Sequence, residues 1–170
     1  MIFAFWAFAA VAIASAFLCI TRRSAVASAL WLVNTLFCLA ALYVLLDAHF
    51  IAAVQVLVYA GAIMVLFLFV IMLLNLGRAG PSDIKGPWGK AVAGVAGLVL
   101  VGELLVFRLA VPPDALRLPP GAVAGTVAAR GAVRAVAEPL FEGYLVPFEI
   151  TSVLLLAAMV GAVVLAKRRL

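Results

Sequence analysis

The feature that most constrains this chain is an apolar run near its middle, IAAVQVLVYAGAIMVLFLFVIMLLNL, at residues 51–76. No charged side chain occurs between Val54 and Leu74, and a run of this length spans a bilayer core of roughly 30 Å as a helix. Water cannot bond to backbone groups in that core, so the helix must satisfy its own peptide groups. The composition agrees, with 69% of the 170 residues hydrophobic and 11% charged. The sequence therefore predicts an all-α integral membrane protein.

Four further apolar stretches bring the number of predicted transmembrane helices to five. The first carries no basic residues before it and is too long for a typical signal peptide, so we expect a retained span. The stretch GRAGPSDIKG at 77–86 predicts a polar turn, and Pro112 and Pro113 are expected to stop the fourth span. The five predicted spans cover residues 3–20, 25–46, 51–76, 88–111 and 144–166.

We expect residues 1–170 to form a single membrane domain, with 112–143 as an extramembrane loop. Within that loop, Thr126, Arg130 and Arg134 fall at helical spacing on one face. This pattern is compatible with a short helix at the membrane surface. A partly ordered loop explains it equally well, and the sequence leaves both open.

Lysine and arginine are unevenly distributed between the two ends of the predicted spans. One side carries the basic residues Arg22, Arg23, Arg78, Lys85, Lys90 and those at 167–169. The opposite side carries His49 alone in its short first link, and its long second link carries Arg108, Arg117, Arg130 and Arg134. Basic residues in short loops mark the cytoplasmic side, so the amino terminus is predicted outside and the carboxyl terminus in the cytoplasm. We therefore interpret the net charge of +5 as setting the orientation in the membrane rather than as a sign of nucleic-acid binding.

The central span carries polar and small residues near its mid-depth. Tyr59, Ala60, Gly61 and Ala62 follow one another there, and Gln55 lies four residues before Tyr59. Residues four apart share a helix face, so Gln55 and Tyr59 are expected to bond to a neighbouring helix or to line a proton route. In the second span, Asn34 and Thr35 are expected to hydrogen-bond between helices.

Two carboxylates lie within predicted spans, where an ionisable group is a functional hypothesis by default. Glu103 lies about two-thirds of the way through the fourth span and five residues before Arg108, a spacing that does not pair them on one face. It either carries protons or pairs with another group. Glu149 lies near the start of the fifth span, where it anchors the helix at the interface or handles protons. Cys19 and Cys38 are expected to be free thiols within spans.

Two stretches of the chain resemble a known family. LDAHFIAAVQVLVYAGAIMVLFLFVIMLLNL resembles the third helix of the J subunit of bacterial proton-pumping NADH:quinone oxidoreductase (respiratory complex I), which is equivalent to mitochondrial NADH dehydrogenase subunit six. LFEGYLVPFEITSVLLLAAMVGAVVLAKR is similar to the last helix of that family with its preceding loop. The two stretches, residues 46–76 and 140–168, cover about a third of the chain.

The resemblance implies a membrane-arm subunit that couples quinone reduction to proton translocation in the bacterial inner membrane, with a periplasmic amino terminus. It implies a π-bulge near Tyr59–Ala62 whose interconversion with α-helix opens or closes a water path and swings Val65 and its neighbours. Some relatives carry glutamate where this chain has Gln55, which cannot release a proton near neutral pH. Proton-path or gating candidates are Tyr59, Gly61, Ala62, Val65, Gln55, Glu103 and Glu149.

The family also implies where the redox chemistry occurs. The complex would use NADH and quinone, with FMN and iron–sulfur clusters in other subunits, so this chain is expected to have no catalytic, cofactor or metal residues. Its partners would be other membrane-arm subunits and the lipid bilayer, without nucleic acid or a small-molecule substrate of its own. Two alternatives remain: a homologous subunit of a membrane-bound hydrogenase or multisubunit cation/proton antiporter, and, ranked lower, an autonomous small transporter.

Overall fold

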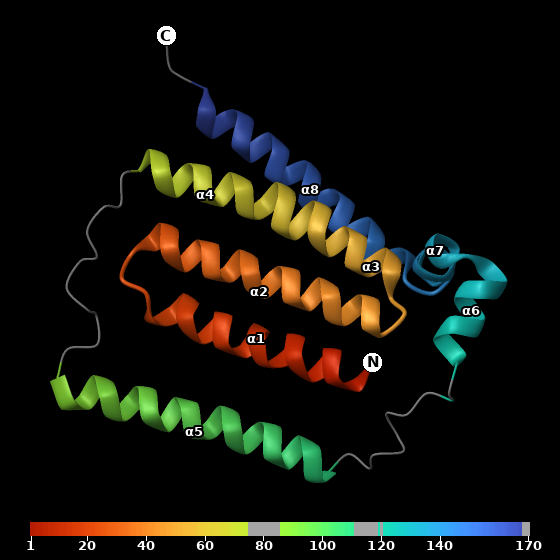
Figure 1. Ribbon diagram of the computed structural model, residues 1–170. Coiled ribbons are helices and arrows are strands. Elements are labelled where there is room, and N and C mark those ends of the chain that lie inside the picture. Colours follow the sequence, from red (N-terminus) through yellow and green to blue (C-terminus); the bar gives the residue numbers. More distant parts are fainter. Residues whose placement is uncertain (75–85, 111–118, 120, 168–170) are drawn as a thin grey trace. The chain divides into compact units, whose positions relative to one another are not determined.

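The computed structural model describes residues 1–74, 86–110, 119 and 121–167. In this part of the chain all regular structure is helical, without strands (Figure 1). The prediction of five apolar helices is confirmed, since five are long and apolar enough to cross a membrane. They are α1 (Ile2–Thr21), α2 (Ala25–Leu45), the joined helix α3–η1–α4 (His49–Leu73), α5 (Gly86–Ala110) and α8 (Leu145–Ala166). Residues 77–85 of the predicted polar turn and Pro112–Pro113 lie outside the described residues.

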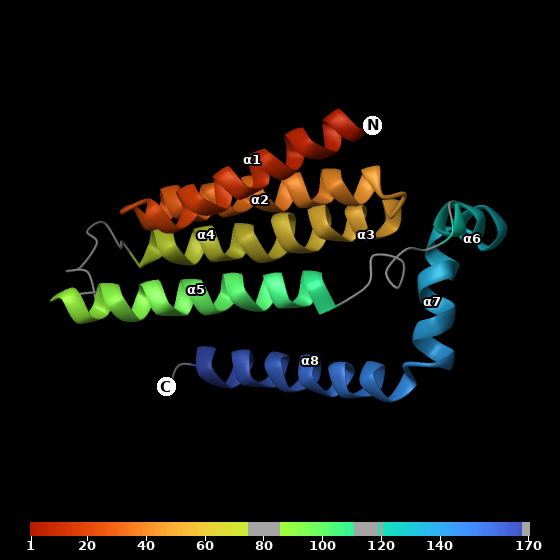
Figure 2. The same cartoon turned by 90° about the horizontal axis from the view of Figure 1, so that it is seen from below.

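The chain divides into two compact units, Met1–Ala122 and Val123–Leu170. In the first unit, α2 lies between α1 and the joined helix and contacts both of them (Figures 1 and 2). A small core forms where α2 meets α4, around the buried side chains of Ala29, Met64 and Ile71. Since α2 supplies contacts on two sides, it holds this group of helices together.

The turn between α1 and α2 is short because side chains close it from both ends. Ser24 begins α2 as its N-cap, and its hydroxyl accepts a hydrogen bond from the Ala27 backbone N–H at 3.4 Å. The Ser28 hydroxyl donates across to the Cys19 backbone carbonyl at the end of α1. The Arg22 guanidinium lies 6.0 Å from the centre of the Trp31 ring, within the range of a cation–π contact.

The turn between α2 and α3 depends on one unusual backbone conformation. Asp47 has φ 60°, in the left-handed region that aspartate tolerates better than most residues. Its backbone N–H donates to the Val44 carbonyl at 3.1 Å, and the Ala48 N–H donates to the Tyr43 carbonyl at 2.9 Å. The chain therefore reverses direction within three residues, and the joined helix runs back along α2.

The second unit contains two short helices before its spanning helix. They are α6 (Ala122–Arg130) and α7 (Ala132–Glu142), separated by Gly131 at φ 83°. Residues 121–143 therefore contain two helices, and the expected single face is divided because Thr126 and Arg130 belong to α6 and Arg134 to α7. Residues 116–118 and 120 of the segment lie outside the described residues. The membrane-surface position of these helices and the single membrane domain stay predictions.

Candidate functional site

The joined helix changes its hydrogen-bonding register in the middle of the bilayer-length segment. Residues Gln55–Ile63 form the π-helix η1, flanked by α3 (His49–Val54) and α4 (Met64–Leu73). Where α-helical bonding resumes, the Met64 backbone N–H still donates to the Tyr59 carbonyl five residues earlier. The π-bulge expected near Tyr59–Ala62 is therefore confirmed, and it extends back to Gln55.

The register change moves the buried face of the helix by one residue. Buried side chains occur at Ala52, Gln55, Ala60, Met64 and Ile71, so the step from position 55 to position 60 is five residues rather than the three or four of an α-helix. Outside its own helix, η1 contacts only α2 among the described elements. The wide turn therefore places Ala60 against α2.

Continued α-helical register would present different side chains to α2. Counting four residues from Gln55 leads to Tyr59, then to Ile63 and, after two further turns, Val70. These side chains are 51%, 50% and 42% exposed in the present register. The two registers thus differ in whether a tyrosine or an alanine occupies the face toward α2 at mid-depth.

Gly61 fits the π register because it has no side chain. A Cβ atom built at this position would lie 3.2 Å from the Val56 backbone carbonyl oxygen, five residues earlier. That separation is tighter than ordinary van der Waals contact, so another residue would displace the carbonyl or the helix. Gly61 and its small neighbours Ala60 and Ala62 explain why the wide turn forms here. π-bulges of this kind are frequently found at functional sites.

Gln55 and Tyr59 differ in exposure although they are four residues apart. Gln55 is 9% exposed, whereas the Tyr59 side chain is 51% exposed. The expectation that they share one face fails because the turn between them is π rather than α. Gln55 faces the α2 side, and Tyr59 is presented at the outer surface of this group of helices.

The other predicted site residues belong to three different helices. Ala62 and Val65 are exposed on the joined helix, as is Glu103 on α5. Glu149 is exposed in the second turn of α8, where its backbone carbonyl accepts a hydrogen bond from the Ser152 hydroxyl at 2.7 Å. The structure places Gln55, Gly61, Ala62, Tyr59 and Val65 on one helix and the two carboxylates on others.

A polar contact between α1 and α2 involves one residue that the sequence did not single out. Ser15 is only 1% exposed, and the Asn34 side-chain amide donates to its hydroxyl at 2.7 Å. Asn34 thus bonds between helices as predicted, whereas the Thr35 hydroxyl donates to the Trp31 carbonyl of its own helix at 3.0 Å. Ser15 lies in a run of small residues. Its hydroxyl within a membrane span was the only sequence signal that it has a hydrogen-bond partner.

No group of three or more His, Cys, Asp or Glu side chains suited to a metal ion occurs within the described part of the chain. Cys19 and Cys38 are free thiols. The polar chemistry that remains near η1 is an amide, a phenol and backbone carbonyls. These groups can hold and order water.

The family model described as NADH-ubiquinone/plastoquinone oxidoreductase chain 6 matches residues 15–165. The chain belongs to this family. It is 36% identical to NADH-quinone oxidoreductase subunit J of Rhodobacter capsulatus over 98% of this chain and 82% of the relative. It is 40% identical to subunit J of Pseudomonas aeruginosa over 95% and 94% of the two chains.

A cyanobacterial relative is also similar. NAD(P)H-quinone oxidoreductase chain 6 of Synechocystis is 42% identical over 76% of this chain, which spans 62% of the relative's length. This is the family that the third and fifth predicted spans resemble. Its match also includes α2, α5, α6 and most of α7, which the two resembling stretches did not include.

Proposed function

We propose that this chain is a membrane-arm subunit of a proton-pumping NADH:quinone oxidoreductase and that η1 gates a water path for protons. The family supports the first part of the proposal. The second part is carried by a single observation, the five-residue step between the buried residues Gln55 and Ala60. That step is a one-residue register shift, which a helix can absorb or release without moving its ends far.

The two registers expose different groups to α2. In the π register the small side chain of Ala60 lies there, beside the buried amide of Gln55. Return to the α register would turn the larger Tyr59 into that position and rotate the residues beyond it, including Val65. Exchange of an alanine for a tyrosine changes the space available to water, and this change is the proposed gate.

In this proposal the gate acts by ordering water rather than by titrating a side chain. Gln55 can donate and accept hydrogen bonds but cannot release a proton near neutral pH. Glu103 and Glu149 are the candidates for proton carriers, since intramembrane carboxylates commonly form such relays. In this proposal they transfer protons, whereas the register change belongs to η1.

The rest of the assembly follows from the family. NADH, FMN, iron–sulfur clusters and quinone would be bound by other subunits, and this chain would carry no redox centre. From its basic loops we infer a periplasmic amino terminus and a cytoplasmic carboxyl terminus in a bacterial inner membrane. Other membrane-arm subunits would cover its exposed apolar helices together with lipid.

Affinity isolation of the tagged chain from native membranes in mild detergent tests the assignment. We expect NADH:quinone reductase activity in the eluate, together with the other subunits of the complex identified by mass. Hydrogenase or antiporter chains in the eluate would instead assign the protein to a related machine. A chain that elutes alone would favour the autonomous transporter.

Gly61→Val tests the gate in the assembled enzyme. The added Cβ would lie against the Val56 carbonyl, 3.2 Å away, and β-branching stiffens the segment further. A strain of about 1–3 kcal/mol on one register shifts their ratio roughly tenfold for each 1.4 kcal/mol. We therefore expect fewer protons pumped per NADH oxidised, measured in proteoliposomes.

Gly161→Val is the matched control for that substitution. A Cβ at Gly161, in α8, meets no atom within 4 Å, so the same added side chain leaves α8 unstrained. An unchanged number of protons pumped per NADH in the Gly61→Val enzyme would contradict the proposal that η1 is the gate. Equal losses in both variants would indicate a general packing defect instead.

Glu103→Gln tests whether this carboxylate carries protons. Glutamine keeps the shape and hydrogen-bonding capacity of the side chain but cannot exchange a proton. We expect lower pumping with an unchanged amount of assembled enzyme. Normal pumping would make Glu103 a structural residue and leave Glu149 as the carboxylate to test.

A further inference from the structure

The helix α7 has one apolar side that extends along its whole length. Val133, Ala137 and Phe141 are four residues apart and line up along the helix, with Val136 and Leu140 beside them. Val133 is 60% exposed and Phe141 is 54% exposed. A helix that presents such a stripe needs an apolar partner, and α7 is much more strongly amphipathic than the spanning helix α8.

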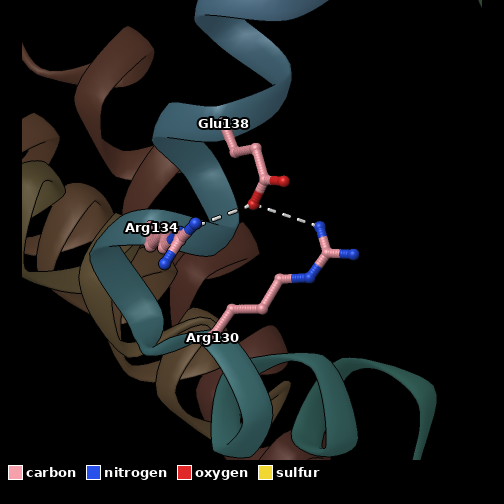
Figure 3. A network of polar contacts seen from close by, with 3 residues as sticks. All are labelled: Arg130, Arg134 and Glu138. Carbon is pink, nitrogen blue, oxygen red and sulfur yellow. Dashed lines mark ion pairs between the residues drawn. The ribbon is translucent and has the colours of Figure 1, made fainter.

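The opposite side of α7 is charged, and Arg130 at the end of α6 balances its charges. Arg134, Glu138 and Glu142 follow one another at four-residue steps. Figure 3 shows the Glu138 carboxylate between two guanidinium groups: the Arg130 Nη1 at the end of α6 is 3.2 Å from Glu138 Oε2, and Arg134 Nε is 3.7 Å from it. These four side chains are the only charges between residues 122 and 142 and sum to zero.

The junction of α7 with α8 fixes the direction of the apolar stripe. Gly143 and Tyr144 separate the helices, and both of their backbone N–H groups donate to the Pro139 carbonyl, at 2.9 and 3.1 Å. The chain turns there, so α7 runs across the axis of α8 rather than continuing it (Figure 2). The ring of Phe141 contacts that of Phe148, in the first turn of α8, with 4.9 Å between centroids.

This geometry relates the stripe to the membrane. If α8 crosses the bilayer, a helix that runs across its axis at its amino-terminal end lies parallel to the membrane surface. Phe141 belongs to the apolar stripe and reaches Phe148 in α8, so the stripe faces the side on which α8 enters the bilayer. Tyr144 at the junction is the kind of residue that is enriched at the membrane–water boundary.

We propose that α7 is an interfacial helix embedded in the membrane surface where α8 begins. The stripe Val133–Ala137–Phe141 would lie against lipid acyl chains, with the charged side among headgroups and water, as in monotopic amphipathic helices. The occupant of the stripe is lipid because the helix is continuous with a transmembrane helix and turns its apolar side toward the depth of that helix. Since the charges of residues 122–142 cancel, α7 is held by apolar burial and does not require anionic lipid.

The test uses the full-length chain in lipid nanodiscs, so that it is independent of the proposed enzyme assembly. In a background with Cys19→Ala and Cys38→Ala, a fluorescent probe is attached to Val133→Cys on the stripe or to the matched control Ala135→Cys on the other side. Quenching is measured with nitroxides on the lipid chains and with iodide in the water. A second pair, Val136→Cys and Glu142→Cys, repeats the comparison if either first variant fails to fold.

We expect lipid nitroxides to quench the probe at position 133 roughly threefold more than that at 135, since interfacial helices bury their apolar face about 5–10 Å into the headgroup–acyl boundary. Iodide should show the opposite order. Equal iodide quenching at both positions would place α7 in water and overturn the proposal. Shielding of the stripe from both quenchers would mean that protein covers it, and would also overturn it.

The lipid composition tests the role of charge. We expect the same quenching in nanodiscs of zwitterionic phosphatidylcholine and in nanodiscs with added anionic phosphatidylglycerol, because the balanced segment gains no net attraction. Each uncompensated basic residue would add about 1 kcal/mol of attraction to an anionic surface. Embedding that occurs only with phosphatidylglycerol would contradict burial as the force that holds α7.

Discussion

The two neighbouring helices α2 and α3–η1–α4 accommodate mid-membrane polar residues in different ways. In α2 the backbone stays α-helical throughout Ala25–Leu45, and the side-chain amide of Asn34 donates a hydrogen bond to the Ser15 hydroxyl of α1. In the joined helix the backbone itself changes, and a five-residue step separates Gln55 from Ala60. Side-chain bonding across an interface leaves a helix regular, whereas the register change depends on small residues that let the backbone widen.

The largest effect is expected for Ala60→Leu, which changes the contact of η1 with α2. Ala60 is 5% exposed and faces α2 in the π register, so added methylene groups would overpack that contact at about 1–3 kcal/mol. We expect a lower free energy of unfolding in detergent micelles and faster amide hydrogen exchange across η1. The control is Ala62→Leu, two residues away on an exposed side, where the change should be small.

If Ala62→Leu destabilised the chain as much as Ala60→Leu, the buried face would not follow the π register. A compensating outcome is also informative. Should Ala60→Leu favour the α register, Tyr59 would pass from an exposed to a buried environment. Its fluorescence would report this in a background that keeps Tyr59 as the sole tyrosine and has the three tryptophans replaced by phenylalanine.

The next largest effect is expected at the α1–α2 contact, with Asn34→Leu. The substitution removes the donor to Ser15, whose hydroxyl is 1% exposed, and interhelical hydrogen bonds of this kind contribute about 0.6–1.7 kcal/mol in membrane proteins. A double-mutant cycle with Ser15→Ala measures the contribution of the pair itself. Additive losses from the two substitutions would show that the hydrogen bond does not couple the helices.

Thr35→Val should have the smallest effect. It contrasts a hydrogen bond within α2 with the hydrogen bond that Asn34 makes to α1. The Thr35 hydroxyl donates to the Trp31 carbonyl of its own helix, a local bond that adds little to helix–helix association. We expect a change in the free energy of unfolding within about 0.5 kcal/mol. A loss as large as that of Asn34→Leu would mean that Thr35 holds a second helix after all.

The sequence predicted the spans well because apolar length is a direct consequence of the bilayer. The resemblance also located the π-bulge, but its extension back to Gln55 depends on which side chains α2 buries, and no local pattern encodes that. Predicting the hydrogen bond between Asn34 and Ser15 would have required knowing the register in which α1 and α2 pack. The division of α6 from α7 at Gly131 was missed because glycine within ARGAVR is compatible with a continuous helix, and only its φ of 83° separates the two.

The candidate site was predicted only in part for a related reason. Tyr59, Gly61 and Ala62 stood out as a tyrosine among small residues, and the structure places them in η1. Ala60 was not selected, since alanine carries no chemical signal, and its importance lies in the space it leaves beside α2. Four-residue spacing grouped Gln55 with Tyr59 because that rule assumes an α-helix.

The closed turn between α1 and α2 bears on how the protein is made. Only Arg22–Ser24 separate the two helices, and the Ser28 and Ser24 hydroxyls bond within this connection. The hairpin therefore has its stabilising contacts between residues that leave the ribosome in close succession, and it can pair before the third helix has been synthesised. We expect α1 and α2 to enter the membrane as one unit, and the joined helix to find in α2 a surface that is already in place.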